Sequence, residues 1–297
     1  MSALPYDLLL LVLARLGCAA SAARTSVLAR RWRRLWTHLP AFAFRDVAFR
    51  SLEPALAQVS VSSPAVPFRM SLLDVHVPDM PPDGTSVTSL LQAAARLSPE
   101  DVVLNLALGL KNRYTDAELP CFHAATSINL DGIFSFVASA AECCFPMLTT
   151  LVLSGVIVDG LTDLISRCPC LRVLRFKGGP WARRGHDIMV HSSSLRELVV
   201  VDDDTLAQCI DIVTPMLEQL TVSFLYQSNL SLCVSAPKAE KVSWCYDIFY
   251  SRGCGLGFGL WNLRKASLTV EAPERSLLRI DGRVSSSTTC ILFYGYK

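Results

Sequence analysis

The sequence carries little charge and no long apolar run. Only 18% of its 297 residues are Asp, Glu, Lys or Arg, and the formal net charge is +2. Proteins dedicated to nucleic-acid binding are usually much more basic, so this balance argues against that class. No stretch of about 18 consecutive apolar residues occurs, which excludes a membrane-spanning helix. We therefore expect neither nucleic acid nor a membrane as a partner.

Recognisable catalytic and cofactor motifs are also absent. The five histidines stand in unrelated contexts, and the spacing around Cys168 and Cys170 does not fit a zinc finger. The glycine-rich stretch RGCGLGFG (252–259) matches neither the dinucleotide-binding pattern nor the P-loop. The three aspartates at 202–204 follow a predicted strand, which favours an exposed turn. We expect no enzyme activity, no bound metal and no cofactor.

The eleven cysteines favour an intracellular protein. Their number is odd and they are scattered, mostly in apolar surroundings, as at Cys121, Cys143, Cys144, Cys209 and Cys233. This pattern predicts buried, reduced thiols rather than a disulfide framework. The leucine run near the N-terminus resembles a secretion signal, but no basic residue precedes it and Arg15 interrupts it. We expect the cytoplasm, the nucleus or both.

The first fifty residues form a basic, leucine-rich head. They hold eight arginines and no lysine, for a formal charge of +6, whereas the rest of the chain carries −4. Pro5 and Gly17 bracket a predicted helix with leucines on nearly every side. A second helical stretch, 19–36, places Leu28, Trp32, Leu35 and Trp36 on one face, and where it breaks is left open. So small a segment cannot bury all this surface alone, so it packs on the rest of the chain or on a partner.

The stretch LPYDLLLLVLARL, continued by AARTSVLARRWRRLWTHLP, resembles an F-box, in particular the plant subgroup. The match covers residues 4 to about 46, with departures at Tyr6 and at Gly17–Cys18. The resemblance implies binding to the Skp-family linker of cullin-based SCF ubiquitin ligases. The residues that it assigns to this contact are Leu4, Pro5, Leu8, Val12, Leu13, Leu16, Val27, Leu28, Arg31, Trp32, Leu35 and Trp36.

The rest of the chain repeats the pattern L-x-x-L-x-L. Six consecutive copies, starting at Leu148, Leu171, Leu195, Leu217, Ala239 and Leu263, follow one another at intervals of 22 to 24 residues. Weaker copies start at Met70, Val103 and Ala125. A period near 23 is the leucine-rich-repeat signature, in which each repeat adds one short parallel strand. Helices are predicted between some strands, at 87–97, 133–143 and 161–165.

These patterns predict a short all-α F-box followed by an irregular leucine-rich-repeat solenoid with parallel strands, an α+β or α/β architecture. We expect an F-box at 1–46, a linker at 47–64, repeats at 65–282 and a tail at 283–297. Curved solenoids usually bind partners on their concave face, where Arg175 and Lys177 form a basic spot. Residues predicted on that face are Asn129, Asp131, Val152, Ser154, Arg175, Lys177, Val199, Val201, Thr221, Ser223, Ser243 and Cys245.

Together with the resemblance, this organisation predicts a non-catalytic substrate receptor of an SCF-type ligase. The F-box would bind the Skp linker, and through it a cullin, while the repeats would hold a target protein of unknown identity. One alternative is a repeat protein that mediates interactions without engaging a ligase. Another is a nucleic-acid binder that uses the arginine cluster Arg30–Arg34.

Overall fold

The structure is a computed structural model that divides into two compact units, Met1–Phe145 and Pro146–Lys297. In the part of the chain that it describes, no helix is both long and apolar enough to cross a membrane. The described residues are 4–45, 47–62, 70–77, 84–106, 115–132, 134–137, 144–159, 161–177, 188–202, 209–226, 231–248, 259–262, 267–271 and 289–291.

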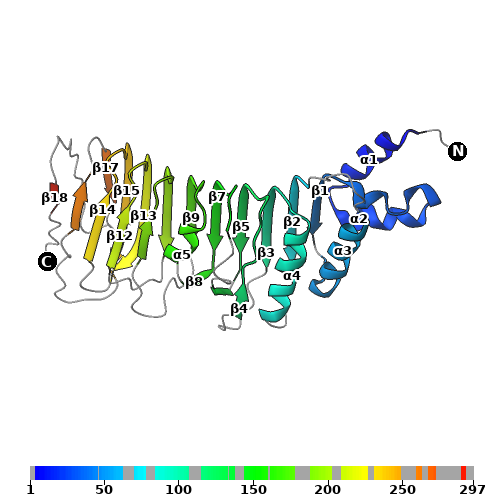
Figure 1. The fold of residues 1–297 in the computed structure, drawn as a ribbon, viewed down its shortest axis with the longest axis horizontal. Coiled ribbons are helices and arrows are strands. Elements are labelled where there is room, and N and C mark those ends of the chain that lie inside the picture. The colour runs from blue at the N-terminus through cyan, green and yellow to red at the C-terminus, as the bar shows by residue number, and fades with distance from the viewer. Residues whose placement is uncertain are drawn as a thin grey trace. The chain divides into compact units, whose positions relative to one another are not determined.

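A parallel sheet organises the first unit (Figure 1). Along its strands buried and half-exposed residues alternate, because successive side chains of a strand point to opposite faces. Leu73 and Val75, for example, have no exposed surface. The strands, in spatial order, are β1 (Ala41–Arg45), β2 (Leu72–Val77), β3 (Asp101–Leu106) and β5 (Ser127–Asp131), and β4 (Thr115–Glu118) pairs separately with β6 (Phe134–Val137).

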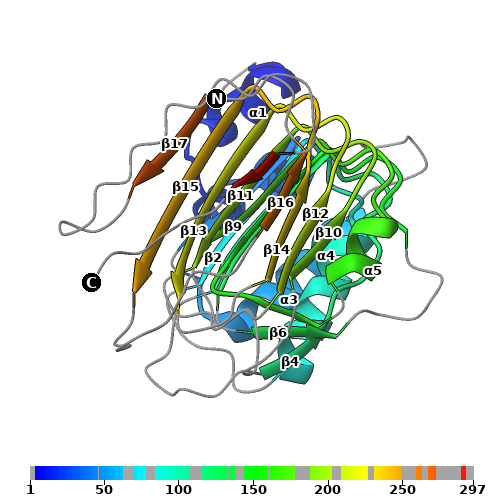
Figure 2. The same ribbon diagram turned by 90° about the vertical axis from the view of Figure 1, so that its left-hand side faces the viewer.

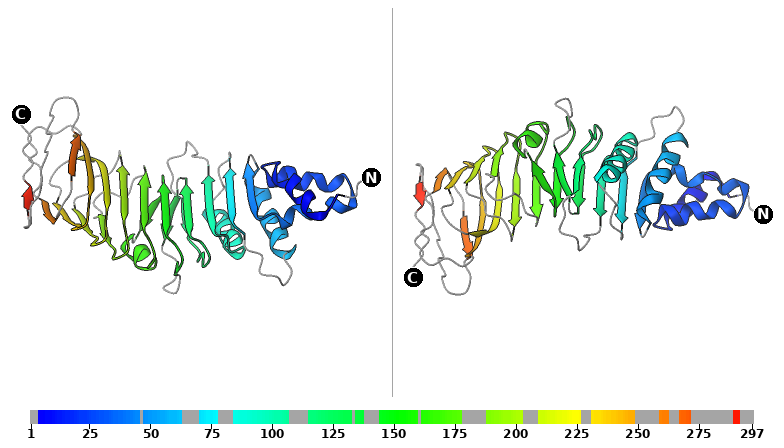
Figure 3. Two further views of the ribbon diagram at one scale, coloured as in Figure 1. Left: turned by 90° about the horizontal axis from the view of Figure 1, so that it is seen from above. Right: turned by 90° about the horizontal axis from the view of Figure 1, so that it is seen from below.

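Two helices, α3 (Phe49–Ser62) and α4 (Gly84–Arg96), form a second layer beside this sheet (Figure 3). Helix α4 confirms the helix predicted there. Helix α3 occupies most of the segment predicted as a linker, 47–64, and its residues Leu52, Leu56 and Val59 are buried at helical spacing despite Pro54. Strand β1 likewise lies inside the segment assigned to the F-box. The parallel sheet therefore begins at Ala41.

Two walls of strands face each other in the second unit (Figure 2). Each coil contributes one strand to the first wall and, from β9 onward, one to the second. The first wall holds β7 (Thr150–Ser154), β9 (Val173–Lys177), β11 (Glu197–Asp202), β13 (Gln219–Tyr226), β15 (Lys241–Ile248) and β17 (Ser267–Glu271). The second holds β10 (Ile188–His191), β12 (Cys209–Val213), β14 (Ser231–Ser235), β16 (Gly259–Asn262) and the antiparallel β18 (Thr289–Ile291). Strand β8 (Ile157–Asp159) and helix α5 (Leu161–Ser166) belong to neither wall and precede β9 in the chain.

The predicted repeat is confirmed over most of its length. The residues that open the copies at 148, 171, 195, 217 and 239 are all buried, and a strand of the first wall follows each of them. Backbone hydrogen bonds join successive coils just before these strands, as from Arg196 N to Arg172 O at 2.8 Å. Leu263 lies outside the described residues. The chain is thus a parallel-strand solenoid of the leucine-rich-repeat type.

Two expectations about the first unit were wrong. The copy assigned to Val103 and Leu106 has another register, because β3 buries Val102, Leu104 and Leu106 and aligns Val102 with Leu73. The helix predicted at 133–143 is contradicted at 134–137, where strand β6 pairs with β4. Both stretches are rich in apolar residues, so their patterns fit more than one register or period.

Candidate functional site

Helix α1 (Tyr6–Ala14) divides its leucines between two sides. Leu9 and Leu13 are buried at 3% and 1% exposure, one turn apart on the inner side. Leu8, Leu11 and Val12 are 43%, 62% and 48% exposed on the outer side. Leu4 and Leu16 extend the exposed stripe beyond the helix ends, and Pro5 is exposed too. The helix is therefore anchored by one edge and leaves an apolar stripe exposed.

The stretch 19–36, predicted as helical with its break left open, is broken into short turns. Helix α2 (Ala19–Arg24) is followed by three 3-10 turns, Thr25–Val27, Arg30–Trp32 and Leu35–His38. Ala29 is extended, and Arg34 takes a left-handed conformation with φ of 58°. These two residues interrupt helical geometry. The single apolar face predicted for Leu28, Trp32, Leu35 and Trp36 does not exist.

The side chains of that predicted face separate into two environments. Val27 and Leu28 are 87% and 69% exposed, whereas Leu35 and Trp36 are buried at 3% and 5%. Trp32 is half-buried. The ring of Trp36 meets Phe42 of strand β1 edge-on, with centroids 6.2 Å apart. Of the residues assigned to the linker contact, Leu13, Leu35 and Trp36 therefore belong to the interior, and the others remain candidates.

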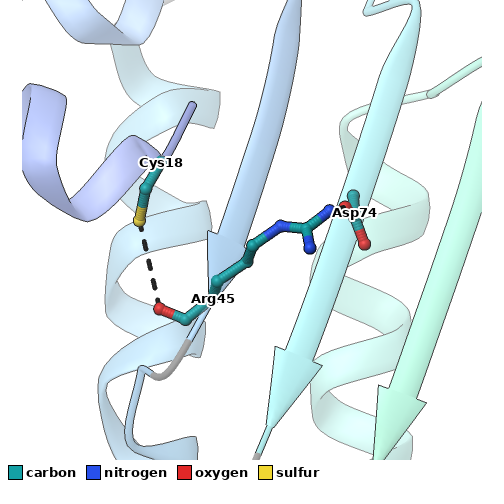
Figure 4. A network of polar contacts seen from close by, with 3 residues as sticks. All are labelled: Cys18, Arg45 and Asp74. Carbon is teal, nitrogen blue, oxygen red and sulfur yellow. Dashed lines mark hydrogen bonds and ion pairs between the residues drawn. The ribbon is translucent and has the colours of Figure 1, made fainter. Parts of the chain in front are cut away.

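Polar contacts hold the head together and attach it to strand β1. The Arg31 guanidinium donates to the Leu4 carbonyl oxygen at 2.6 Å, which joins the start of α1 to the second 3-10 turn. The Cys18 thiol makes a weak hydrogen bond to the Arg45 carbonyl oxygen at 4.0 Å, and the Arg45 guanidinium pairs with Asp74 at 2.7 Å (Figure 4). Arg31, assigned to the linker contact, thus also holds the module together.

On the outward face of the first unit, four neighbouring strands align Arg45, His76, Asn105 and Asp131 in one row. The Asn105 amide donates to the Asp131 carboxylate at 3.3 Å. Burial raises the pKa of Asp131, and the nearby His76 opposes this by lowering it. Asn129, also predicted on this face, is half-buried. The sequence reasoning missed His76 and Asn105, which the register of β2 and β3 would have supplied.

The raised pKa of Asp131 predicts a pH-dependent difference between wild type and Asp131→Asn. The folded chain protonates this carboxyl more readily than the unfolded chain, so the wild type gains stability relative to the variant at low pH. This gain should be full below about pH 3.9 and should disappear as the pH rises toward neutrality. Because the side chain is half-exposed, we expect on the order of a few tenths of a kcal/mol.

Urea denaturation of both chains between pH 4 and 7 measures this difference. The matched control is Asp116→Asn, which removes an exposed carboxylate of strand β4. If the stability of Asp131→Asn varies with pH in parallel with that of the control, burial does not raise the pKa of Asp131.

The outward face of the second unit carries the other predicted target-binding residues. Arg175 stands in one cross-strand row with Thr221 and Ser243, and Lys177 in the next with Ser154 and Ser223. The predicted basic spot is partly neutralised, because the Arg175 guanidinium pairs with Glu197 at 2.7 Å. Lys177 is exposed, and the other residues of these rows are half-buried. Cys245 has no described side chain.

The cysteines depart from expectation at two positions. Cys121 is disulfide-bonded, which corrects the prediction that it is a reduced thiol. Cys144 is free but exposed rather than buried, whereas Cys209 and Cys233 are free and half-buried. Cys143 lies outside the described residues. Alternation of apolar residues predicts burial inside strands, and Cys121 and Cys144 both lie in connecting segments.

An anchored helical head with an exposed apolar stripe, followed by a parallel-strand repeat solenoid, defines a protein of the leucine-rich-repeat class. Comparison with family models specifies the class. An F-box domain matches residues 1–43, and the family "FBD-associated F-box protein At5g56370, LRR repeats" matches residues 89–244. The chain therefore belongs to the F-box/leucine-rich-repeat family. No curated protein and no solved structure matches it. F-box proteins typically serve as substrate adaptors of SCF ligases.

Proposed function

We propose that this protein is a substrate-recognition subunit of an SCF-type ubiquitin ligase. Its F-box binds a Skp-family linker, which connects it to a cullin, and its solenoid holds a target protein. It performs no bond chemistry. It acts by effective concentration, because a target tethered beside an activated ubiquitin meets it in a local rather than a bimolecular encounter.

The observation that carries this proposal is the exposed apolar stripe of α1 in a module whose other side is anchored. Leu8, Leu11 and Val12 are between 43% and 62% exposed, and Val27 and Leu28 more so. Each such side chain would contribute about 1.5–3 kcal/mol when fully buried in an apolar groove. An amphipathic helix that lays this stripe into a groove is a common recognition mode. The exposed Arg30 and Arg33 would steer the head toward an acidic partner.

The proposal assigns different roles to the residues of the head. Leu4, Pro5, Leu8, Val12, Leu16, Val27 and Leu28 would touch the linker, with Leu11 added because it is exposed. Leu13, Leu35 and Trp36 would support the contact from inside. Arg31 and the half-buried Trp32 would do both. The division we propose is a head that ends before Ala41, followed directly by the repeat body.

We expect the double substitution Leu8→Asp/Val12→Asp to weaken binding to a Skp-family linker by about 100-fold or more. Two carboxylates would have to be desolvated where the wild type buries two apolar side chains. Isothermal titration of the full chain with a purified plant Skp linker measures the affinity. Circular dichroism confirms that the variant is folded.

The matched control is Met189→Asp. It places a carboxylate on another exposed apolar residue, 40% exposed on β10, far along the chain from the head. Its linker affinity should equal that of the wild type. If the wild-type chain does not bind the linker, the ligase role is wrong. Equal losses in the two variants would show that α1 is not the contact.

A further inference from the structure

Strand β9 places basic side chains between short neutral ones. Its neighbours in the sheet are β7 and β11, and the pairing register is regular. Arg175 stands between Val152 and Val199, and Lys177 stands between Ser154 and Val201. The neutral side chains are shorter than Arg and Lys, so both cations can project beyond them from the face of the sheet. The four flanking side chains are half-buried, so they leave part of their surface open.

The charge of this strip is only partly compensated. Glu197 pairs with Arg175 at 2.7 Å, and Glu218 pairs with Arg196 of the following coil at 3.4 Å. Lys177 and Arg172, at the two ends of the β9 segment, are exposed, and neither has a carboxylate partner among the residues that the structure describes. The chain after residue 50 carries a net charge of −4. The strip is therefore positive within a body that is negative overall.

Such a surface selects a definite chemistry. A carboxylate or phosphate that approaches Lys177 meets a cation that has no carboxylate partner among the described residues, and Arg172 adds a second positive charge at the other end of the strand. The methyl groups of Val152, Val199 and Val201 flank the cations, so an apolar side chain beside the anion can be buried in the same contact. Pairing of anionic with apolar groups at fixed spacing gives specificity as well as affinity.

We infer that the strip formed by Arg172, Arg175 and Lys177, flanked by Val152, Val199 and Val201, binds an acidic segment of the target protein with an apolar residue next to the acidic one. The inference rests on the proposed function, since it names the kind of target that the repeat body takes. The bound segment lies across β7, β9 and β11, with its anionic group at Lys177.

Selection of a phage-displayed library of random 12-residue peptides against the full chain tests the inference. Enriched peptides are synthesised with a fluorescent label, and their affinities are measured by anisotropy for the wild type, Lys177→Glu and Lys241→Glu. Lys241 is the control, because it is an exposed, outward-facing lysine on β15, outside the strip. Each peptide is also made with its acidic residue replaced by phosphoserine or by Gln.

We expect enriched peptides to carry Asp or Glu beside an apolar residue. Lys177→Glu should lower the affinity for these peptides by about 10-fold, and Lys241→Glu should lower it by less than about 2-fold. The Gln peptides should bind the wild type as weakly as the acidic peptides bind Lys177→Glu. A phosphoserine peptide that binds more tightly than its carboxylate version would identify phosphate as the anion, and the reverse order a carboxylate. Enrichment without acidic residues, or equal effects of the two lysine variants, would overturn the inference.

Titration of the same wild-type preparation with the Skp linker separates the two proposals. Linker binding without acidic peptide enrichment contradicts the strip and leaves the ligase role standing. Acidic peptides that depend on Lys177, without linker binding, contradict the ligase role and support the strip.

Discussion

Trp36→Ala is expected to lower the free energy of unfolding of the first unit by about 3–5 kcal/mol. The side chain is only 5% exposed and meets Phe42, which in turn stacks on Phe44 at a centroid distance of 6.3 Å. Removing the indole leaves a cavity where the head joins strand β1, and a close-packed interior closes such a cavity only in part. Urea denaturation followed by far-UV circular dichroism measures the loss.

Leu28→Ala is the matched control for this prediction. Leu28 is 69% exposed, so its truncation should change the stability by less than about 0.5 kcal/mol. In titrations of folded protein with the linker, Leu28→Ala should lower the affinity more than Trp36→Ala does, because Leu28 would touch the linker directly. If the two variants lose the same stability, Trp36 does not anchor the head to the solenoid.

Phe176→Ala should cost the second unit about 3–5 kcal/mol of stability. Phe176 is 1% exposed and lies on β9 between Leu153 of β7 and Val200 of β11, both of them buried. Each coil of a solenoid contacts only its neighbours, so a cavity in one coil weakens two interfaces at once. Thermal and urea unfolding of the full chain should both show the loss.

The neighbouring substitution Lys177→Ala is the control for Phe176→Ala. Lys177 follows Phe176 on the same strand but points outward and is exposed, so we expect a change below about 0.5 kcal/mol. The contrast tests the alternation on which the repeat assignment depends. Similar losses at both positions would mean that β9 does not separate an inner from an outer face here.

Much of the solenoid could be predicted because its signal is repeated. One L-x-x-L-x-L is weak, but copies at 22 to 24 residues support one another, and the strands after 148, 171, 195, 217 and 239 follow them. The helices α4 and α5 were also predicted from their apolar spacing. Helix α3 was missed, and the copy near Val103 was misplaced, because a single segment has no repeat to fix its register.

In the head, the sequence identifies the segment but does not place its side chains. The F-box pattern identifies the segment, since several residue types recur at fixed spacing. It does not say which apolar side chains face inward, because leucines occupy nearly every side of α1. Leu8 and Leu9 are adjacent in sequence, yet one is 43% exposed and the other 3%. Only contact with the 3-10 turn Leu35–His38 decides between them.

The sequence by itself determined the family, the parallel-strand repeat and the basic head, because these depend on periodicity and composition along the chain. The tertiary structure decided which residues are left for partners. It moved Leu13, Leu35 and Trp36 into the interior, left Val27 and Leu28 exposed, and set Lys177 without a carboxylate among the described residues while Arg175 received Glu197. These outcomes depend on strand register and on backbone breaks such as that at Arg34, which bring together side chains distant in sequence.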